Sequence, residues 1–322
     1  MQRRWVTASL VPLMWMGMSC RSVPAGQEQE TAASRYEYTE VHMGTRVRLV
    51  LHASGRLVAD SAAREAYDRV ARLEDIFSDY RPQSELSRIG RGAGEWVVVS
   101  SEMLHVIGLA LRVADVTAGS FDPTIKPLVT LWREARDSGV MPPVERVDSA
   151  RALAGWRKVR LDTARNAVLL PLAGMQLDLG GIAKGYILGE ALEVLRERGV
   201  SSALVEAGGD LVVGDAPPGS RGWRVEVPGA TQQFTSRSAL LLNEAMATSG
   251  SSAQFVEIEG VRRSHVLDPR TGLGVTHELT AHVIHADAAL ADALATALSV
   301  MGKEGVEIVR RRFPGVVIEI SG

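Results

Sequence analysis

Polar and apolar residues alternate with two different periods along the chain. Mostly apolar residues at odd positions from 41 to 51 alternate with polar ones at 42, 46 and 48 and predict one half-buried strand, because successive side chains of a strand point to opposite faces. Apolar residues spaced three and four apart predict helices over 60–77, 101–114, 182–195 and 288–301. Short apolar runs predict further strands at 202–206, 211–213, 223–227, 254–258 and 279–284, and a hairpin from 158–162 and 167–170. Strands and helices mixed in this way, with several hairpin connections, predict an α+β (mixed α/β) fold rather than a doubly wound parallel sheet.

One stretch of the chain combines the two periods. The apolar run Met175–Leu179 predicts a short buried strand, Gly180 and Gly181 follow it, and helical spacing begins at Ile182. A glycine turn lets backbone N–H groups approach a ligand closely, with the positive end of the helix dipole behind them. This arrangement favours an anion such as a phosphate, although the same pattern is also typical of an ordinary strand-to-helix connection.

The composition sets limits on the class of protein. The chain has 322 residues with 46% hydrophobic content, which is enough for one large domain or two small ones. A net charge of −2 gives no basic footprint, so the sequence predicts no nucleic-acid partner. Cys20 is the single cysteine, so no internal disulfide can form.

The first twenty residues have the pattern of an export signal. Two arginines at positions 3 and 4 precede a largely apolar stretch that is too short to cross a bilayer comfortably. The stretch ends in Gly17-Met18-Ser19-Cys20, which resembles a bacterial lipidation site; an ordinary signal peptide with a chance cysteine is the alternative. We therefore expect a lipoprotein signal over 1–20 with lipidation at Cys20, a flexible polar tether over 21–38 and one folded domain over 39–322.

Several short motifs follow one another between residue 40 and the C-terminus. They are Met43-Gly44-Thr45, Ser78-Asp79-Tyr80, the loop Gly119-Ser120-Phe121-Asp122-Pro123-Thr124, the stretch from Asp178 to Tyr186, Gly208-Gly209-Asp210, Thr248-Ser249-Gly250, the loop from His265 to Gly272, and Ala291-Asp292-Ala293-Leu294-Ala295-Thr296-Ala297. Each motif alone is weak. Together, in this order and spacing, they resemble the ApbE family, the FAD:protein FMN transferases.

The resemblance implies a reaction and a metal site. Members of the family move FMN from FAD to a Thr or Ser hydroxyl of a target protein and release AMP, so a divalent metal on the phosphate oxygens and an orienting group for the hydroxyl are expected. Asp292 and Thr296 are four residues apart on one helix face, and their oxygens suit Mg²⁺. The resemblance adds the backbone carbonyl of Ala183 as a third ligand. The alternative is structural: Asp292 would cap its helix and Thr296 would bond to its own i−4 carbonyl, while Asp287 is another candidate cap.

The resemblance also assigns the other candidate residues. His265 and Asp292 are the catalytic candidates, since a histidine can transfer a proton at neutral pH. The flavin would be held by Met43, Tyr80, Ser120, Phe121 and Asp122, and the rest of FAD by Asp178, Gly180, Gly181, Lys184, Tyr186, His265 and Thr271. Asp178 could hold the glycine turn or meet Lys184, Lys184 could be a solvated lysine, and Tyr186 could simply pack.

Three functions remain open at this stage. The leading one is a Mg²⁺-dependent FAD:protein FMN transferase. Its partners would be FAD and flavoprotein subunits with a Ser/Thr acceptor motif, as in Rnf-type or Na⁺-translocating NADH:quinone oxidoreductase complexes. The alternatives are an FAD pyrophosphatase that yields FMN and AMP, and a non-catalytic FAD-binding lipoprotein. The lipid anchor would hold the protein on a membrane facing the periplasm, and Arg21 after Cys20 favours the outer membrane.

Overall fold

The computed structural model describes residues 33–227, 238–250 and 255–322. Residues 33–322 form one compact unit. The predicted export signal, the lipidation site at Cys20 and the tether as far as residue 32 lie outside the described residues. The predicted tether is too long at its other end, because the first strand begins at Ser34 and residues 34–38 are part of the sheet.

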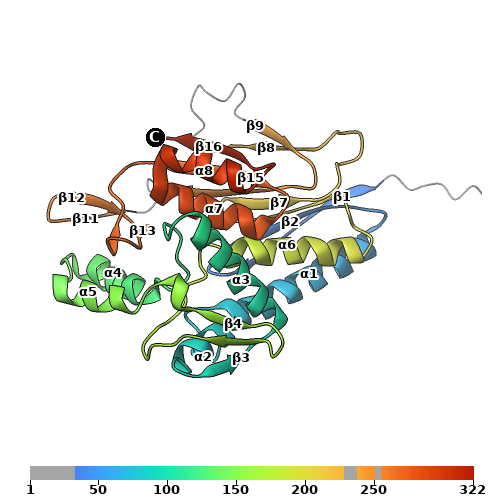
Figure 1. Cartoon of the computed structure of the whole chain (residues 1–322). Coiled ribbons are helices and arrows are strands. Elements are labelled where there is room, and N and C mark those ends of the chain that lie inside the picture. The colour runs from blue at the N-terminus through green and yellow to red at the C-terminus, as the bar shows by residue number, and fades with distance from the viewer. Residues whose placement is uncertain (1–32, 228–237, 251–254) are drawn as a thin grey trace, which may run out of the picture. The chain divides into compact units, whose positions relative to one another are not determined.

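The centre of the unit is a seven-stranded antiparallel sheet (Figure 1). Its strands lie in the order β1 (Ser34–His42), β2 (Thr45–Ala53), β6 (Ala203–Ala207), β7 (Asp210–Val213), β10 (Ala245–Gly250), β15 (Thr280–His285) and β16 (Val317–Ser321). Every neighbouring pair in this sheet is antiparallel. The predicted α+β class is therefore confirmed.

The first predicted strand is in fact a hairpin. Apolar residues recur at odd positions from 41 to 51, but the chain reverses at Met43 and Gly44, which both adopt positive φ, 52° and 70°. The two-residue turn pairs residues of opposite parity, so Val41 lies opposite Arg46 and is exposed, and the alternation that continues through the turn does not mark one buried face. The pair Met43-Gly44 thus forms the turn between β1 and β2.

The two faces of the sheet are covered differently. Helices α1 (Arg56–Phe77), α6 (Ala183–Glu197) and α7 (Ala288–Met301) pack on one face (Figure 1). Helices α3 (Ser101–Val116) and α8 (Gly305–Arg312) pack against α7 and extend the same apolar core. The other face is covered by the hairpin of β8 (Trp223–Glu226) and β9 (Ser238–Leu241). Strand β2 shows why: Leu49 and Leu51 point into the helical core, whereas Val50 packs against the hairpin side.

Smaller elements surround this core. Helix α2 (Glu85–Arg91) lies beside a three-stranded sheet of β3 (Trp96–Val98), β5 (Ala167–Leu169) and β4 (Arg160–Asp162), which confirms the predicted 158–170 hairpin. Helices α4 (Lys126–Ser138) and α5 (Val144–Ala152) share a second apolar cluster with β11 (Phe255–Ile258) and β13 (Leu267–Asp268). The remaining elements are β12 (Val261–Ser264), β14 (Leu273–Gly274) and the short helices η1 (Trp156–Lys158) and η2 (Gly302–Glu304).

The segment before the glycine turn was expected to be a strand, and that expectation is wrong. Met175, Leu177 and Leu179 are buried in alternation, as an extended chain requires, but the segment pairs with no strand among the described residues. The backbone N–H of Asp178 instead donates to the carbonyl of Pro123 at 2.8 Å. Burial between helices, rather than a sheet ladder, therefore produces the apolar period here.

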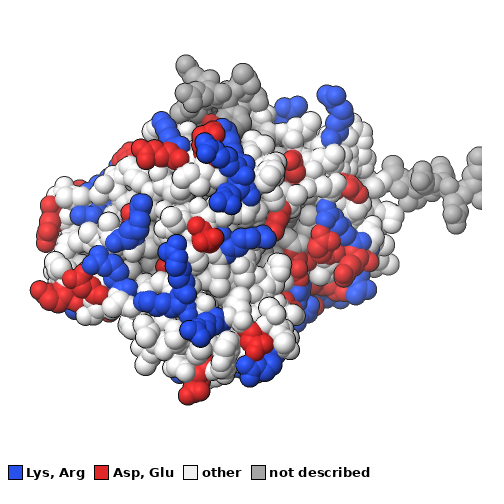
Figure 2. Space-filling model, in the orientation of Figure 1, with Lys and Arg blue, Asp and Glu red and all other residues white. Residues whose placement is uncertain are grey.

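The surface of the described part of the molecule carries both basic and acidic side chains (Figure 2). On the face shown in Figure 2, basic side chains are interrupted by acidic ones, so this face carries no continuous field of one sign. None of the helices in the described ranges is both long enough and apolar enough to cross a membrane.

Candidate active site

A cleft of about 760 Å³ opens where α4, the N-terminal end of α6 and one edge of α7 come together with strands β10 and β15. Eleven of the residues predicted from the sequence line it. They are Tyr80, Ser120, Phe121, Asp122, Asp178, Gly180, Gly181, Lys184, His265, Asp292 and Thr296. Segments that are more than 200 residues apart in the sequence thus contribute to one cavity.

Glycines bring the turn and α6 close to α7. A Cβ atom on Gly181 would lie 2.9 Å from Thr296 Oγ1. A Cβ atom on Gly185 would lie 2.2 Å from the carbonyl oxygen of Ala288 and 2.8 Å from the Cβ of Asp292. A side chain at Gly181 would displace the Thr296 side chain, whereas one at Gly185 would collide with the backbone of α7, so glycine at 185 is required for the contact between the two helices.

Asp292 is buried beside that contact. Its Oδ2 accepts a hydrogen bond from the Gly185 N–H at 3.0 Å. Burial raises the pKa of Asp292 from 3.8 to about 7, the negative charge of Asp210 adds to the rise, and Lys184 opposes it. The N-cap of α7 is Asp287, which accepts from the Leu290 N–H at 3.0 Å. Asp292 is therefore not a capping residue, and its ionised form is poorly stabilised by the protein alone.

Asp210 connects two lining residues from behind the cleft. It pairs with Lys184 at 2.9 Å through one oxygen, and its other oxygen accepts from the Thr248 N–H at 2.9 Å. The hydroxyl of Thr248 is in turn 3.0 Å from Nδ1 of the buried His282. Burial raises the pKa of Asp210, against the effect of Lys184. Lys184 is thus held in an ion pair and is not a solvated lysine.

These partners were not among the predicted site residues. Asp210 and Thr248 stand in the sequence motifs Gly208-Gly209-Asp210 and Thr248-Ser249-Gly250, so the motifs themselves were the available signal. His282 lies in no such motif, and only the register of β10 with β15, which pairs Thr248 with His282, brings it to the site.

The opposite end of the cleft contains aromatic and polar side chains. Tyr80 is 76% exposed, and the guanidinium of Arg133 lies 4.8 Å from the centroid of its ring. Asp122 accepts from the Thr124 N–H and hydroxyl at 2.8 and 2.6 Å, so it braces its own loop. Asp178 Oδ1 accepts from the Gly180 N–H at 2.9 Å, which settles its role between the two that the sequence left open: it holds the glycine turn.

His265 follows β12 and is exposed at the cleft. The preceding residue fixes its loop, because the carbonyl of Ser264 accepts from the indole N–H of Trp132 at 3.1 Å and its hydroxyl accepts from the Val266 N–H at 3.0 Å. A histidine in such a loop has a fixed backbone and an accessible ring. This is the arrangement that proton transfer to or from a bound substrate needs.

Comparison with known proteins assigns this geometry to a family. The model of the ApbE family matches residues 43–318. The chain is 31% identical to the FAD:protein FMN transferase of Klebsiella pneumoniae over 281 residues, with 86% of each protein covered. The corresponding figure for the Vibrio cholerae enzyme is 32% over 256 residues, with 77% of this chain and 76% of that protein covered. The crystal structure of the ApbE protein of Thermotoga maritima superimposes with a TM-score of 0.79 at 30% identity, covering 89% of this chain and 94% of that one.

The chain belongs to the ApbE family. Within this family fold, four of the predicted site residues do not line the cleft. Met43 forms the β1–β2 turn and packs against the core, and Tyr186 contacts the ring of Phe77 edge-on at 5.6 Å. Thr271 is exposed in a turn, and its N–H donates to the Asp268 carbonyl at 3.2 Å. Ala183 is the buried first residue of α6.

The residues present fit a hard divalent cation such as Mg²⁺. Asp292 offers a carboxylate whose charge is poorly compensated, and Thr296 offers a hydroxyl on the same face of α7 at the cleft. Within the described part of the chain, no three His, Cys, Asp or Glu side chains cluster as a metal site. A site built from one carboxylate, one hydroxyl and backbone oxygen is consistent with that finding. The Ala183 carbonyl would have to bind with the lone pair that its helix leaves unused.

Proposed function

We propose that this chain is a Mg²⁺-dependent FAD:protein FMN transferase that attaches FMN through a phosphoester bond to a Ser or Thr of a target flavoprotein and releases AMP. The observation that carries the proposal is the convergence of Asp292, Thr296, the Gly180-Gly181 turn and His265 on one cleft. Membership of the ApbE family supports it. The cleft has the size of a cavity that encloses a nucleotide cofactor.

The chain's own residues have defined tasks in this proposal. The Lys184 ammonium at the cleft and the positive end of the α6 dipole would bind the negative charge of the phosphates, while the N–H groups of Ala183 and Gly185 stay bonded to Leu179 and Asp292. Asp292, Thr296 and the Ala183 carbonyl would hold Mg²⁺, which supplies charge neutralisation at the pyrophosphate. His265 orients the acceptor hydroxyl and takes its proton.

The step balances without a further reactant. The acceptor oxygen forms a bond to the phosphorus of the FMN half, the bond between that phosphorus and the bridging oxygen breaks, and AMP leaves with the bridging oxygen. The proton of the hydroxyl passes to His265 and then to solvent. Since phosphoryl transfer is mainly positioning and charge stabilisation, these few groups suffice.

The place of action and the partners are part of the proposal. A lipid on Cys20 would hold the enzyme at the periplasmic face of a membrane, with the outer membrane favoured by Arg21. The acceptors would be subunits of Rnf-type or Na⁺-translocating NADH:quinone oxidoreductase complexes that carry a Ser/Thr motif. The export signal predicted over 1–20 supports this location, because such a signal would direct the chain out of the cytoplasm.

A single incubation tests the proposal. The purified chain is mixed with FAD, MgCl₂ and a subunit of either complex that carries the motif, and the intact mass of the acceptor is measured with and without EDTA. The expected result is a gain of one FMN less water that EDTA abolishes. FAD cleaved to FMN and AMP without a mass gain would instead support a pyrophosphatase, and FAD bound but unchanged would support a binding protein.

A further inference from the structure

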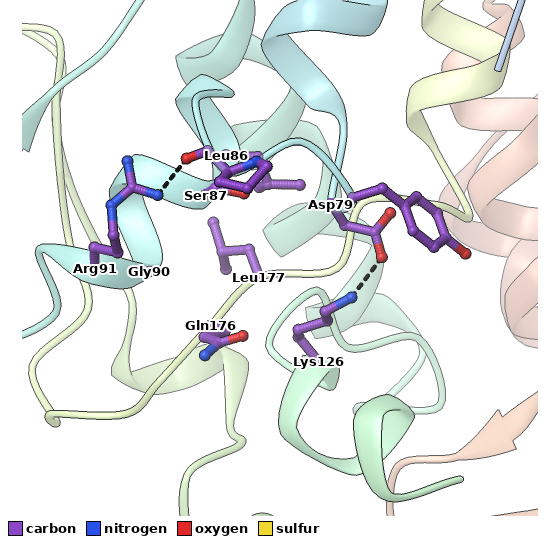
Figure 3. Close-up of a pocket in the computed structure, with 10 residues that line it drawn as sticks. Asp79, Leu86, Ser87, Gly90, Arg91, Lys126, Gln176 and Leu177 are labelled. Carbon is purple, nitrogen blue, oxygen red and sulfur yellow. Dashed lines mark hydrogen bonds and ion pairs between the residues drawn. The ribbon is translucent and has the colours of Figure 1, made fainter. Parts of the chain in front are cut away.

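A second pocket of about 340 Å³ lies next to the cleft (Figure 3). It is formed by α2, the loop after α1, the start of α4 and the extended segment at Gln176 and Leu177. Tyr80 lines both cavities, so the two adjoin at this residue. None of the residues predicted to bind FAD or metal lines this pocket except Tyr80.

The pocket has an excess of positive charge. Figure 3 shows Arg91 on one side and Lys126 on the other, with Leu177 and Gln176 between them. Lys126 pairs with Asp79 at 2.5 Å, and Arg133 reaches the same carboxylate at 3.0 Å. Burial by itself would raise the pKa of Asp79, but these two cations outweigh it and hold the pKa below its usual value.

Arg91 is the cation that Asp79 does not compensate. Its guanidinium donates to the carbonyl of Pro82, and it has no carboxylate partner among the described residues. A side chain that is exposed and fixed by a neutral acceptor keeps its full charge available to a ligand. The pocket is therefore suited to a carboxylate with an apolar stem, since Leu86, Leu177 and Pro82 supply the apolar surface.

The pocket is close to the expected site of reaction. Gln176 lines the pocket and Gly180 lines the cleft, and four residues of extended chain span at most about 14 Å. A second extended polypeptide with its hydroxyl at the glycine turn would thus reach the pocket with a side chain about four or five residues away. FAD would fill the cleft on the other side of Tyr80 and leave the pocket open.

We propose that this pocket binds the acceptor polypeptide and takes an acidic side chain near the Ser or Thr that receives FMN. The inference rests on the proposed transferase function, which requires a second, polypeptide substrate beside FAD. It names the surface that selects this substrate, and Arg91 is its specificity-determining residue.

The chain offers a matched pair of variants for the test. Arg91 and Arg88 are both exposed arginines of α2 and both donate to a backbone carbonyl, of Pro82 and Val98 respectively, but only Arg91 lines the pocket. In R91E the KM for the acceptor subunit should rise about three- to tenfold, because one favourable charge contact becomes a repulsive one. The dissociation constant for FAD, measured by flavin fluorescence, should stay unchanged. R88E should leave both values unchanged.

A double-mutant cycle identifies the acidic partner. Each Asp or Glu within about five residues of the acceptor hydroxyl is replaced by its amide, and one replacement should remove the KM difference between the unmodified enzyme and R91E. Equal acceptor KM values for R91E and R88E would overturn the inference and leave the transferase proposal intact. A loss of FAD affinity as large as the rise in KM would also overturn it, since the pocket would then belong to the FAD site. If the unmodified enzyme transfers no FMN, both proposals are wrong.

Discussion

Replacing Asp292 by Asn keeps the hydrogen bond that this side chain accepts and removes the negative charge that it carries. Asn has the same shape and can still accept the Gly185 N–H through its amide oxygen, so the α6–α7 contact is retained. The change removes the negative charge that Mg²⁺ would need. An Ala replacement would be less informative, because it would leave the Gly185 N–H unpaired inside the helix contact.

The structure gives the sign and the size of the effect on stability. A pKa that rises from 3.8 to about 7 on folding corresponds to a loss of roughly 4 kcal/mol of folding stability when the carboxyl is ionised. This is an upper limit, because the ionised carboxylate also stabilises the Lys184 ammonium. The folded pKa lies above the unfolded one, so this carboxylate lowers the free energy of unfolding as pH rises from about 4 to about 7, and the loss is complete above pH 7. Asp292→Asn should therefore stabilise the metal-free protein at pH 8 by about 1–4 kcal/mol, roughly 2–10 °C in Tm.

The assay is thermal unfolding with and without Mg²⁺. Bound Mg²⁺ should stabilise the unmodified protein by about 2.7 kcal/mol at one hundred times its dissociation constant, and should not stabilise Asp292→Asn. The two proteins should converge in Tm only below about pH 3, under the unfolded pKa of 3.8, where the carboxyl is neutral in both the folded and the unfolded state. A metal-free Asn variant that is less stable at pH 8, or one that keeps the Mg²⁺-dependent rise in Tm, would refute the assignment of Asp292 as the metal ligand.

Three further predictions follow from the other side chains. His265→Ala should lower kcat about 10²- to 10⁴-fold in a single-turnover transfer assay with the FAD affinity unchanged; an equal loss of affinity would make His265 a binding residue instead. His282→Phe should remove the partner of the Thr248 hydroxyl and lower kcat about tenfold. Arg46→Phe, which introduces the same side chain at an exposed position of β2, serves as the control in the same assay. Asp79→Asn should lower the free energy of unfolding by about 1–3 kcal/mol at pH 7. Because the folded pKa of Asp79 is depressed, that difference should vanish as the pH falls through it, as urea unfolding at pH 7 and pH 3 would show.

The elements with a strong period were predictable from the sequence. The helix over 288–301 was placed at its observed bounds, and Asp287 was among its candidate caps. An apolar helical run directly after an acidic residue allows few other start positions for the helix. The strand at 211–213 was likewise found within one residue. The helix expected from residue 60 begins earlier, at Arg56, since the turn at Gly55 precedes it without a side-chain cap.

The candidate site was predictable only in part, and the reason is physical. Asp292, Thr296 and Lys184 belong to motifs whose residues share one helix face or one turn, and local geometry fixes such relations. The pairing of Lys184 with Asp210 depends instead on how α6 packs on the sheet beside β7, which no local period encodes. Thr248 lies on β10, where its backbone N–H and its hydroxyl find partners in Asp210 and His282.

The glycines near the site carry different parts of the function, and the structure separates them. Gly180 and Gly181 form the turn that is offered to an anion, whereas Gly185 lets α6 touch α7 at Ala288. That contact is also what buries Asp292 and raises its pKa. Tight packing of the two helices therefore leaves the ionised form of Asp292 destabilised. A bound divalent cation would offset the free-energy cost of burying that charge. Packing between the helices and affinity for metal are then two aspects of one contact, so a side chain at position 185 should impair both together.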